Sequence, residues 1–254
     1  MIEYAADTHL GRVRTGNEDA FIADAALGLF AVADGLGGHQ GGEVASRIAA
    51  ETVAGFVRAS SIDTNITWPE GLDPSISFES NQLRSATLLA NRRIRQEAER
   101  QPEFAGMGST FVATLLEREK AAFVCVGDSR LYRWRAGALT QLSEDDTWLA
   151  SMLRAGASPA SLQSHGMRHM LTRALGSVPT LDVKVQHTQF DRGDILLLCS
   201  DGLYGPIGDQ GIARILEASG TSLVAAVAGL IDAANAAGGP DNITAVLVRK
   251  DIET

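Results

Sequence analysis

The feature that most constrains how this chain can fold is a carboxylate placed repeatedly at the end of an apolar run. Residues 28–33 form a strand-like segment that leads into Asp34 and a glycine-rich turn beginning at Gly35. A second apolar run ends in Asp201, and Asp241 opens a third run after a Gly-Pro turn. Glycine lets the backbone approach an ion closely. One such turn is equally consistent with an Asp at the start of a helix, but its repetition predicts an acidic pocket that needs cations.

Three more acidic residues extend the pattern and indicate the kind of metal. Asp128 lies between two strand-like runs, and Glu18 and Asp19 lie near the N-terminus. With the backbone carbonyl of Gly35, all candidate ligands are oxygens, which suit Mg²⁺ or Mn²⁺ better than Zn²⁺. Several carboxylates can hold two ions about 3.5–4 Å apart, and a water or hydroxide that bridges them can attack phosphorus in line. The acidic set therefore predicts metal-dependent hydrolysis of a phosphate ester.

An arginine and a histidine lie close to these acids in the sequence. Arg14 precedes Glu18 by four residues, and its guanidinium could clamp a phosphate through two parallel hydrogen bonds. The alternative is a surface arginine, and Arg12 competes for the role. His39 could protonate the departing alkoxide, or it is an exposed histidine at a helix N-terminus. The residues alone leave these alternatives open.

Composition limits the classes of partner and compartment. The net charge is −9 over 254 residues, without a Lys/Arg-rich block, which argues against nucleic acid as a main partner. No apolar run approaches the roughly 18 residues of a membrane span, and the N-terminus lacks the pattern of a secretory signal. Cys125 and Cys199 lie inside apolar runs, as buried free thiols do. We therefore expect a cytoplasmic monomer with no membrane partner.

The order of apolar patterns predicts a layered α+β fold. Strand patterns occupy 2–8, 20–25, 28–33, 109–117, 120–127, 130–135, 181–189, 193–199 and 243–249. Helical patterns occupy 43–58, 82–100, 145–155, 208–218 and 221–236, and 60–80 has the composition of a loop. Since strands and helices do not alternate regularly, mostly antiparallel sheets with helices on their outer faces fit better than a doubly wound parallel sheet.

Seven short motifs follow one another from residue 7 to the C-terminus. They are Gly11-Arg12-Val13-Arg14 with Asn17-Glu18-Asp19, Val32-Ala33-Asp34-Gly35-Leu36-Gly37-Gly38-His39 with Gly42-Glu43-Val44-Ala45-Ser46, Gly106-Met107-Gly108-Ser109-Thr110, Val126-Gly127-Asp128-Ser129-Arg130, Leu171-Thr172-Arg173-Ala174-Leu175-Gly176, Cys199-Ser200-Asp201-Gly202-Leu203, and Gly239-Pro240-Asp241-Asn242-Ile243-Thr244. In this order they resemble the metal-dependent serine/threonine protein phosphatases of type 2C, in their compact bacterial form. The resemblance covers nearly the whole chain.

The resemblance implies a four-layer α-β-β-α sandwich with two central sheets and the metals at one end of them. It implies one catalytic domain over 1–254 with a flap at about 143–170. Leu36 stands where many eukaryotic members carry a His proposed as general acid, so the proton donor is His39 or metal-bound water. Asp146 stands where the flap usually has a His, and 165–169 lacks the usual His-Pro pair, so substrate choice through the flap can differ.

The resemblance also implies which residues hold two Mn²⁺ or Mg²⁺ ions. Asp34 would bridge both ions and be the only carboxylate to do so. Asp201 and Asp241 would hold the first ion, and the Gly35 carbonyl the second.

Further acids would complete the site. Glu18 and Asp19 would act at the second ion, directly or through water. Asp128 would bind a third, weaker ion together with Asp201. Arg14 matches the phosphate-binding arginine of the family, which favours the clamp over the surface alternative.

By this resemblance the chain would hydrolyse phosphoserine and phosphothreonine in proteins, the marks of a bacterial Ser/Thr kinase pathway. Two other functions compete. A phosphatase of small phosphorylated metabolites would use the same metal chemistry. A catalytically silent binding module would usually lack metal carboxylates, whereas none is missing here.

Overall fold

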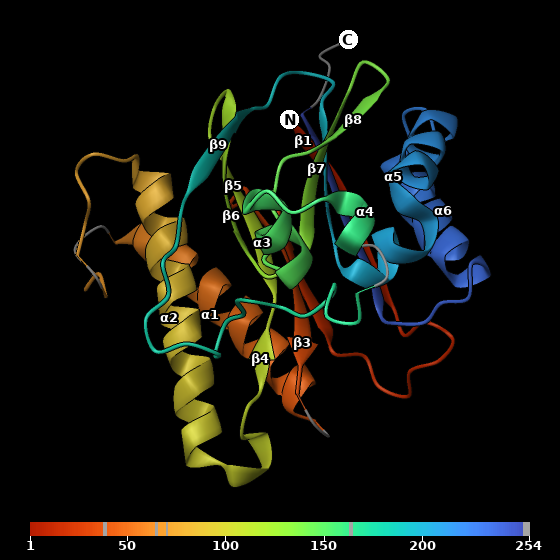
Figure 1. Ribbon diagram of the computed structural model, residues 1–254. Helices are drawn as coiled ribbons and strands as arrows, with labels where there is room; N and C mark the ends of the chain where they lie inside the picture. The colour runs from red at the N-terminus through yellow and green to blue at the C-terminus, as the bar shows by residue number, and fades with distance from the viewer. Residues whose placement is uncertain (38–39, 64–65, 70, 163–164, 251–254) are drawn as a thin grey trace.

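Two antiparallel sheets pack face to face, and helices cover both outer faces (Figure 1). The computed structural model describes residues 1–37, 40–63, 66–69, 71–162 and 165–250. The expected four-layer α-β-β-α sandwich is confirmed. No helix within these ranges is long and apolar enough to span a bilayer.

Sheet 1 contains the two ends of the described chain side by side. Its strands follow the order β1-β11-β10-β7-β8, with every neighbouring pair antiparallel. Their bounds are β1 (Ile2–His9), β7 (Arg130–Arg135), β8 (Ala138–Gln141), β10 (Ile195–Cys199) and β11 (Ile243–Lys250).

Sheet 2 has the order β2-β3-β5-β6-β9, and β4 pairs with the end of β3. Its strands are β2 (Asp19–Asp24), β3 (Leu29–Leu36), β4 (Gly108–Ser109), β5 (Phe111–Leu116), β6 (Lys120–Val126) and β9 (Gln186–Gln189).

The helices form the outer layers. Sheet 2 is covered by α1 (Gly41–Ile62) and α2 (Phe78–Arg100), and sheet 1 by α5 (Asp201–Ala218) and α6 (Leu223–Ala236). The 3-10 helix η1 (Pro102–Phe104) follows α2, and α3 (Trp148–Arg154) and α4 (Pro159–Leu162) lie between β8 and β9.

Three apolar clusters separate these four layers. Alternate side chains of a strand point to opposite faces. On β3, Phe30 and Val32 therefore enter the cluster between the sheets, while Ala31 and Ala33 pack under α1 and α2. Burial on both faces explains why β3 and β10 are continuous apolar runs in the sequence. Only their ends can carry polar groups toward solvent.

The structure differs from the expected elements at several places, and three of the differences concern sheet strands or the start of a long helix. β8 was not predicted; it pairs with β7 through a tight turn in which Ala136 (φ 50°) and Gly137 (φ 81°) are left-handed. The strand expected at 181–189 is only β9. The helix expected from 208 begins at Asp201 instead, because non-helical backbone at Gly208 (φ 62°, ψ 171°) divides α5 and obscures its first turns in the sequence.

Candidate metal centre

Acidic residues of both sheets meet at one end of the sandwich because of how the strands pair. Asp34 on β3 is directly opposite Asp19, the first residue of β2, so both side chains lie on the same face. Asp201 follows β10 and Asp241 precedes β11, and these strands are antiparallel neighbours. The end of β10 and the start of β11 therefore lie at the same edge of sheet 1.

Asp19 connects the two sheets at this end. Its Oδ2 accepts hydrogen bonds from Ser200 Oγ at 2.8 Å and Thr244 Oγ1 at 2.6 Å, and both hydroxyls belong to the sheet 1 side. Its Oδ1 is buried and has no hydrogen-bond partner within the described ranges. Burial raises the pKa of Asp19 to about 6, in spite of the two hydroxyl contacts. A buried acceptor without a donor is costly, and a cation would relieve that cost.

Asp34 and Asp128 are linked through hydroxyl groups. Thr110 Oγ1 accepts a hydrogen bond from the Asp34 N–H at 3.2 Å and lies 2.6 Å from Ser129 Oγ. Burial, and after it the charges of the neighbouring aspartates, raise the pKa of Asp34 well above its ordinary range. Burial and the charge of Asp201 raise the pKa of Asp128 to about 7. The carboxylates thus lie within electrostatic reach of one another.

Asp201 is the first residue of α5, where the helix N-terminus favours negative charge. Its Oδ1 is buried and is a second oxygen without a hydrogen-bond partner among the described residues. Burial and the charge of Asp241 raise its pKa. A Cβ at Gly202 would overlap the carbonyl oxygen of Asn242. Glycine at this position therefore lets the two acidic turns approach each other.

Arg14 lies against Asp241 at the mouth of the site. Its Nη2 donates to Asp241 Oδ2 at 2.7 Å, and half of its side chain (52%) remains exposed. Asn242 fixes the loop that carries Arg14: its Nδ2 donates to two carbonyl oxygens of the 10–16 loop, both at 3.0 Å, and its Oδ1 accepts from the Glu18 N–H at 2.8 Å. The structure therefore brings a guanidinium to the carboxylates.

Glu18 and Gly35 meet at the N-terminus of α1. The Gly35 N–H donates to the Glu18 carbonyl oxygen at 3.0 Å. A Cβ at Gly35 would overlap the Gly42 carbonyl oxygen, and one at Gly42 would overlap the Glu18 carboxylate. Burial is the main reason why the pKa of Glu18 is raised. The two glycines thus allow this carboxylate to sit against the first turn of α1.

These residues fit a hard cation. Their donors are oxygens, two of those oxygens are buried without a hydrogen-bond partner among the described residues, and burial raises the pKa of several of the carboxyl groups. Within the described ranges, no three acidic, histidine or cysteine side chains already close on one point as a metal cage. The acids form an open set, drawn from several elements, with the oxygen chemistry that Mg²⁺ and Mn²⁺ prefer.

The candidate proton donors stand differently. His39 lies outside the described residues, so its role remains a prediction. Leu36 is partly buried at the end of β3 and has no proton to give. Sequence analysis gave His169 no role; in the structure its charge would lower the pKa of Asp201. His169 lies at the C-terminal end of the predicted flap, where its spacing from the acids gave no signal.

Sequence analysis also gave no individual role to two residues that position the acids. Ser200 and Asn242 lie inside motifs quoted above, yet their contacts with Asp19 and Glu18 join residues 181 and 224 positions apart. No local pattern reports such pairing.

The chain is similar over nearly its whole length to proteins of one family. The family model for protein phosphatase 2C matches residues 9–247. The serine/threonine protein phosphatase PstP of Mycobacterium tuberculosis is 36% identical over 252 residues, which cover 97% of this chain and 45% of PstP. The serine/threonine phosphatase stp of Listeria monocytogenes is 33% identical, with 96% of this chain and 94% of stp covered. The chain thus spans about half the length of PstP but nearly all of stp.

Solved structures show the same fold. A crystal structure of the Mycobacterium tuberculosis phosphatase PstP/Ppp superposes with a TM-score of 0.84 at 33% identity, covering 99% of both chains. The PstP catalytic domain in complex with two manganese ions gives a TM-score of 0.82 at 32% identity, again covering 99% of both. Fold and site define an α-β-β-α protein with an acidic centre between two sheets. The chain belongs to the protein phosphatase 2C family.

Proposed function

We propose that this chain is a Mn²⁺- or Mg²⁺-dependent phosphatase that hydrolyses phosphoserine and phosphothreonine in proteins. The observation that supports it most is the meeting of carboxylates from both sheets. Two of their buried oxygens have no hydrogen-bond partner among the described residues, and Arg14 pairs with a third acid of the set, Asp241. The relatives named as serine/threonine phosphatases, and the PstP structure with two manganese ions, support the same reaction.

Asp34 would hold both ions. Asp201 and Asp241 would complete the first position, and the Gly35 carbonyl, with Glu18 and Asp19 directly or through water, the second. Asp128 would serve a third. When bound, such ions make a water more acidic and stabilise charge on the phosphoryl oxygens. The chain contributes orientation and charge placement to this chemistry.

Arg14 is the residue best placed to bind the phosphoryl group. A guanidinium offers two parallel donors to a phosphate, as it does to a carboxylate. In the structure one of its nitrogens already lies on Asp241, at the edge of the acidic set. A phosphate placed there would be bound by Arg14 on one side and face the carboxylate-held ions on the other.

The test is a pair of measurements on one variant. Wild-type protein should hydrolyse an aryl phosphate and a phosphothreonine peptide with Mn²⁺, and EDTA should stop both reactions. Asp34→Asn should lower kcat by at least about 10³-fold, as expected for loss of a group that acts on the transition state, while circular dichroism shows an intact fold. Undiminished activity in Asp34→Asn would refute the proposal.

Substrate class is decided by a comparison of rates. We infer protein substrates of a bacterial Ser/Thr kinase, because the relative PstP is named as a serine/threonine protein phosphatase and stp as a serine/threonine phosphatase. Phosphopeptides should therefore give a higher kcat/KM than sugar phosphates. The reverse order would favour the metabolite alternative, which shares the metal site.

The remaining inferences concern organisation. We propose a single catalytic domain in which 143–170 acts as the flap, since its two stems pair through Thr147 and Leu171. A cytoplasmic location is supported by the free thiols of Cys125 and Cys199. A monomer is expected, and sedimentation of the purified chain would test it.

A further inference from the structure

The loop that carries Asp128 is held mainly by residues outside the acidic set. This Asp128 loop, Gly127–Ser129, connects β6 to β7. Gly127 has a left-handed φ of 98°, and a Cβ there would lie 2.8 Å from Thr110 Cβ. A turn of this kind is specified by what surrounds it. The residues that surround it belong largely to the flap base, Ser143–Thr147.

Asp146 forms hydrogen bonds with both the N–H and the carbonyl group of Gly127. The Asp146 N–H donates to the Gly127 carbonyl oxygen at 2.7 Å, and the Gly127 N–H donates to Asp146 Oδ2 at 3.1 Å. The same Oδ2 accepts from Arg173 Nε at 2.9 Å and lies 2.8 Å from Arg173 Nη2. Thr172 N–H donates to the Asp146 carbonyl oxygen at 2.7 Å. Asp146 thus joins both stems of the predicted flap to the Asp128 loop.

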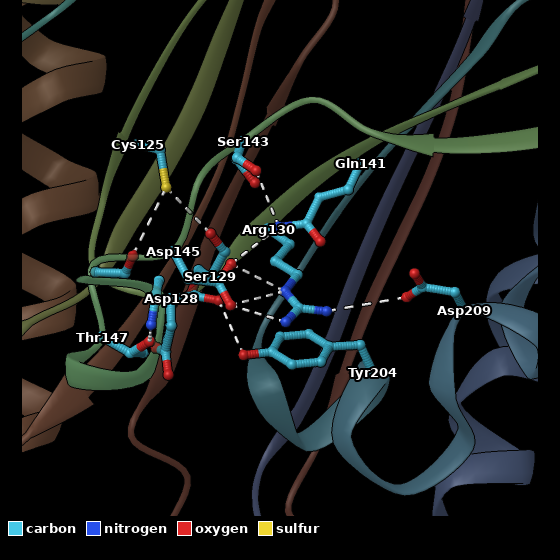
Figure 2. A network of polar contacts seen from close by, with 12 residues as sticks. Cys125, Asp128, Ser129, Arg130, Gln141, Ser143, Asp145, Thr147, Tyr204 and Asp209 are labelled. Atoms are coloured by element: carbon cyan, nitrogen blue, oxygen red, sulfur yellow. Dashed lines mark hydrogen bonds and ion pairs between the residues drawn. The ribbon is translucent and has the colours of Figure 1, made fainter. Parts of the chain in front are cut away.

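Asp145, the preceding residue, makes a second attachment to the loop through Arg130 and Tyr204 (Figure 2). Arg130 donates to its carboxylate from Nε at 3.0 Å and from Nη2 at 2.7 Å. The Arg130 guanidinium stacks over the ring of Tyr204, 3.7 Å from its centroid. The Tyr204 hydroxyl then donates to the Asp128 carbonyl oxygen at 3.0 Å. A chain of contacts therefore runs from the flap base through α5 to Asp128.

The two acids Asp146 and Glu144 of the flap base differ in exposure and in their contacts with the Asp128 loop. The Asp146 side chain is only 10% exposed, so its bonds are not exchanged freely with water. The neighbouring Glu144 is 76% exposed and pairs with Arg154 at 3.4 Å without touching the loop. Asp146 is therefore hydrogen-bonded to the loop, whereas Glu144 is a nearby acid that pairs elsewhere.

We propose that Asp146 is a positioning residue that orients Asp128, so that the placement of the flap base and the affinity of Asp128 for a cation are coupled. The inference rests on the proposed metal role of Asp128. Asp146 stands where the resemblance places a His. Its carboxylate would orient the Asp128 loop.

The first readout needs neither metal nor substrate. Hydrogen exchange should show faster exchange at Gly127–Arg130 in Asp146→Ala, by about tenfold or more, because a charge-assisted hydrogen bond to a backbone N–H is lost. Asp146→Asn should be intermediate, since its amide oxygen can still accept from Gly127 while the ion pair with Arg173 is lost. Glu144→Ala is the matched control and should leave this segment unchanged. Unchanged exchange in Asp146→Ala would overturn the inference.

The second readout is a double-mutant cycle on Mn²⁺ binding, measured by calorimetry. Asp146→Ala should weaken the weakest Mn²⁺ step about tenfold, and Tyr204→Phe, which keeps the stacked ring, should weaken it about threefold. In an Asp128→Ala background both changes should have no further effect. Equal losses with and without Asp128 would show a general structural role and overturn the inference.

The outcome can be separated from failure of the proposed function. If Asp128→Ala leaves Mn²⁺ binding unchanged, Asp146 has no cation affinity to set, and the inference falls. The proposed function is judged independently by Asp34→Asn. Loss of activity in that variant would keep the phosphatase proposal intact even when the coupling through Asp146 is refuted.

Discussion

Asp19 and Asp34 stand directly opposite each other on the antiparallel strands β2 and β3, with both carboxylates on one face. Like charges in this relationship destabilise a sheet. Burial raises the pKa of both residues. Protonation of either carboxyl group therefore reduces the repulsion between them. Hydroxyls on the sheet 1 side stabilise one oxygen of Asp19, and the other oxygen has no hydrogen-bond partner in the part of the chain that the structure describes. The pair is therefore a position where the folded chain gains from a cation.

The stability of the metal-free protein should fall as pH rises from about 5 to 7.5. The pKa is about 6 for Asp19 and about 7 for Asp128 in the folded chain, against about 3.9 for an unfolded Asp. Between these values the folded state binds more protons than the unfolded state, so its stability is lost as pH rises through the folded pKa values. In EDTA, we expect the Tm to drop by about 5 °C or more across this range.

Mn²⁺ and one substitution provide the controls for that titration. Saturating Mn²⁺ should raise the Tm most at pH 7.5, since a ligand of the folded state stabilises by mass action. Asp34→Asn should raise the metal-free Tm at pH 7.5 and flatten the pH dependence. A metal-free Tm that rises between pH 5 and 7.5 would contradict the electrostatic account.

The strand-end acids of this site could be predicted from the sequence. The tertiary contacts that orient them could not. β3 and β10 are buried on both faces, so their apolar runs stop where a polar residue can reach solvent. The ends of these runs therefore predicted the positions of Asp34 and Asp201. The start of α5 was missed, because Gly205, Pro206 and the left-handed Gly208 break its helical pattern. The contacts that orient the acids join distant residues, and such tertiary pairing has no local periodicity.

Arg14→Ala should lower kcat/KM for a phosphopeptide by about 100-fold, the loss expected for a charged, bidentate contact with phosphate. Arg14→Lys should recover only part, because an ammonium lacks the planar fork. Arg12→Ala is the matched control two residues away. Its backbone N–H bonds to the Gly239 carbonyl oxygen at 2.8 Å, and that contact survives the substitution. Equal losses in both alanine variants would remove the special role of Arg14.

Gly202→Ala should separate the turns that carry Asp201 and Asp241. The added Cβ would overlap the Asn242 carbonyl oxygen and lie 3.3 Å from Asp241 Cβ, so the backbone has to move. We expect at least about 2 kcal/mol lost from the free energy of unfolding, as for overpacking in a tight core, together with weaker Mn²⁺ binding.

Gly205→Ala on the same helix tests whether the effect of Gly202→Ala is local. Nothing lies within 4 Å of a Cβ at Gly205, so this change should be neutral or stabilise by up to about 1 kcal/mol through helix propensity. Similar destabilisation by the two substitutions would mean that the close approach at Gly202 is not the cause.

His169 can be tested as a proton donor through the leaving group. Its charge reaches Asp201, so the imidazole is close enough to the acidic set to merit comparison with His39. A serine alkoxide needs a proton as it departs, whereas a nitrophenolate leaves without one. His169→Gln should therefore lower kcat on a phosphopeptide by about 10–100-fold and on p-nitrophenyl phosphate by less than about threefold. His165→Gln is the control, because that ring stacks on Trp148 with centroids 4.2 Å apart. If His169→Gln slows both substrates equally, the donor is not His169, and His39→Gln is the variant to compare next.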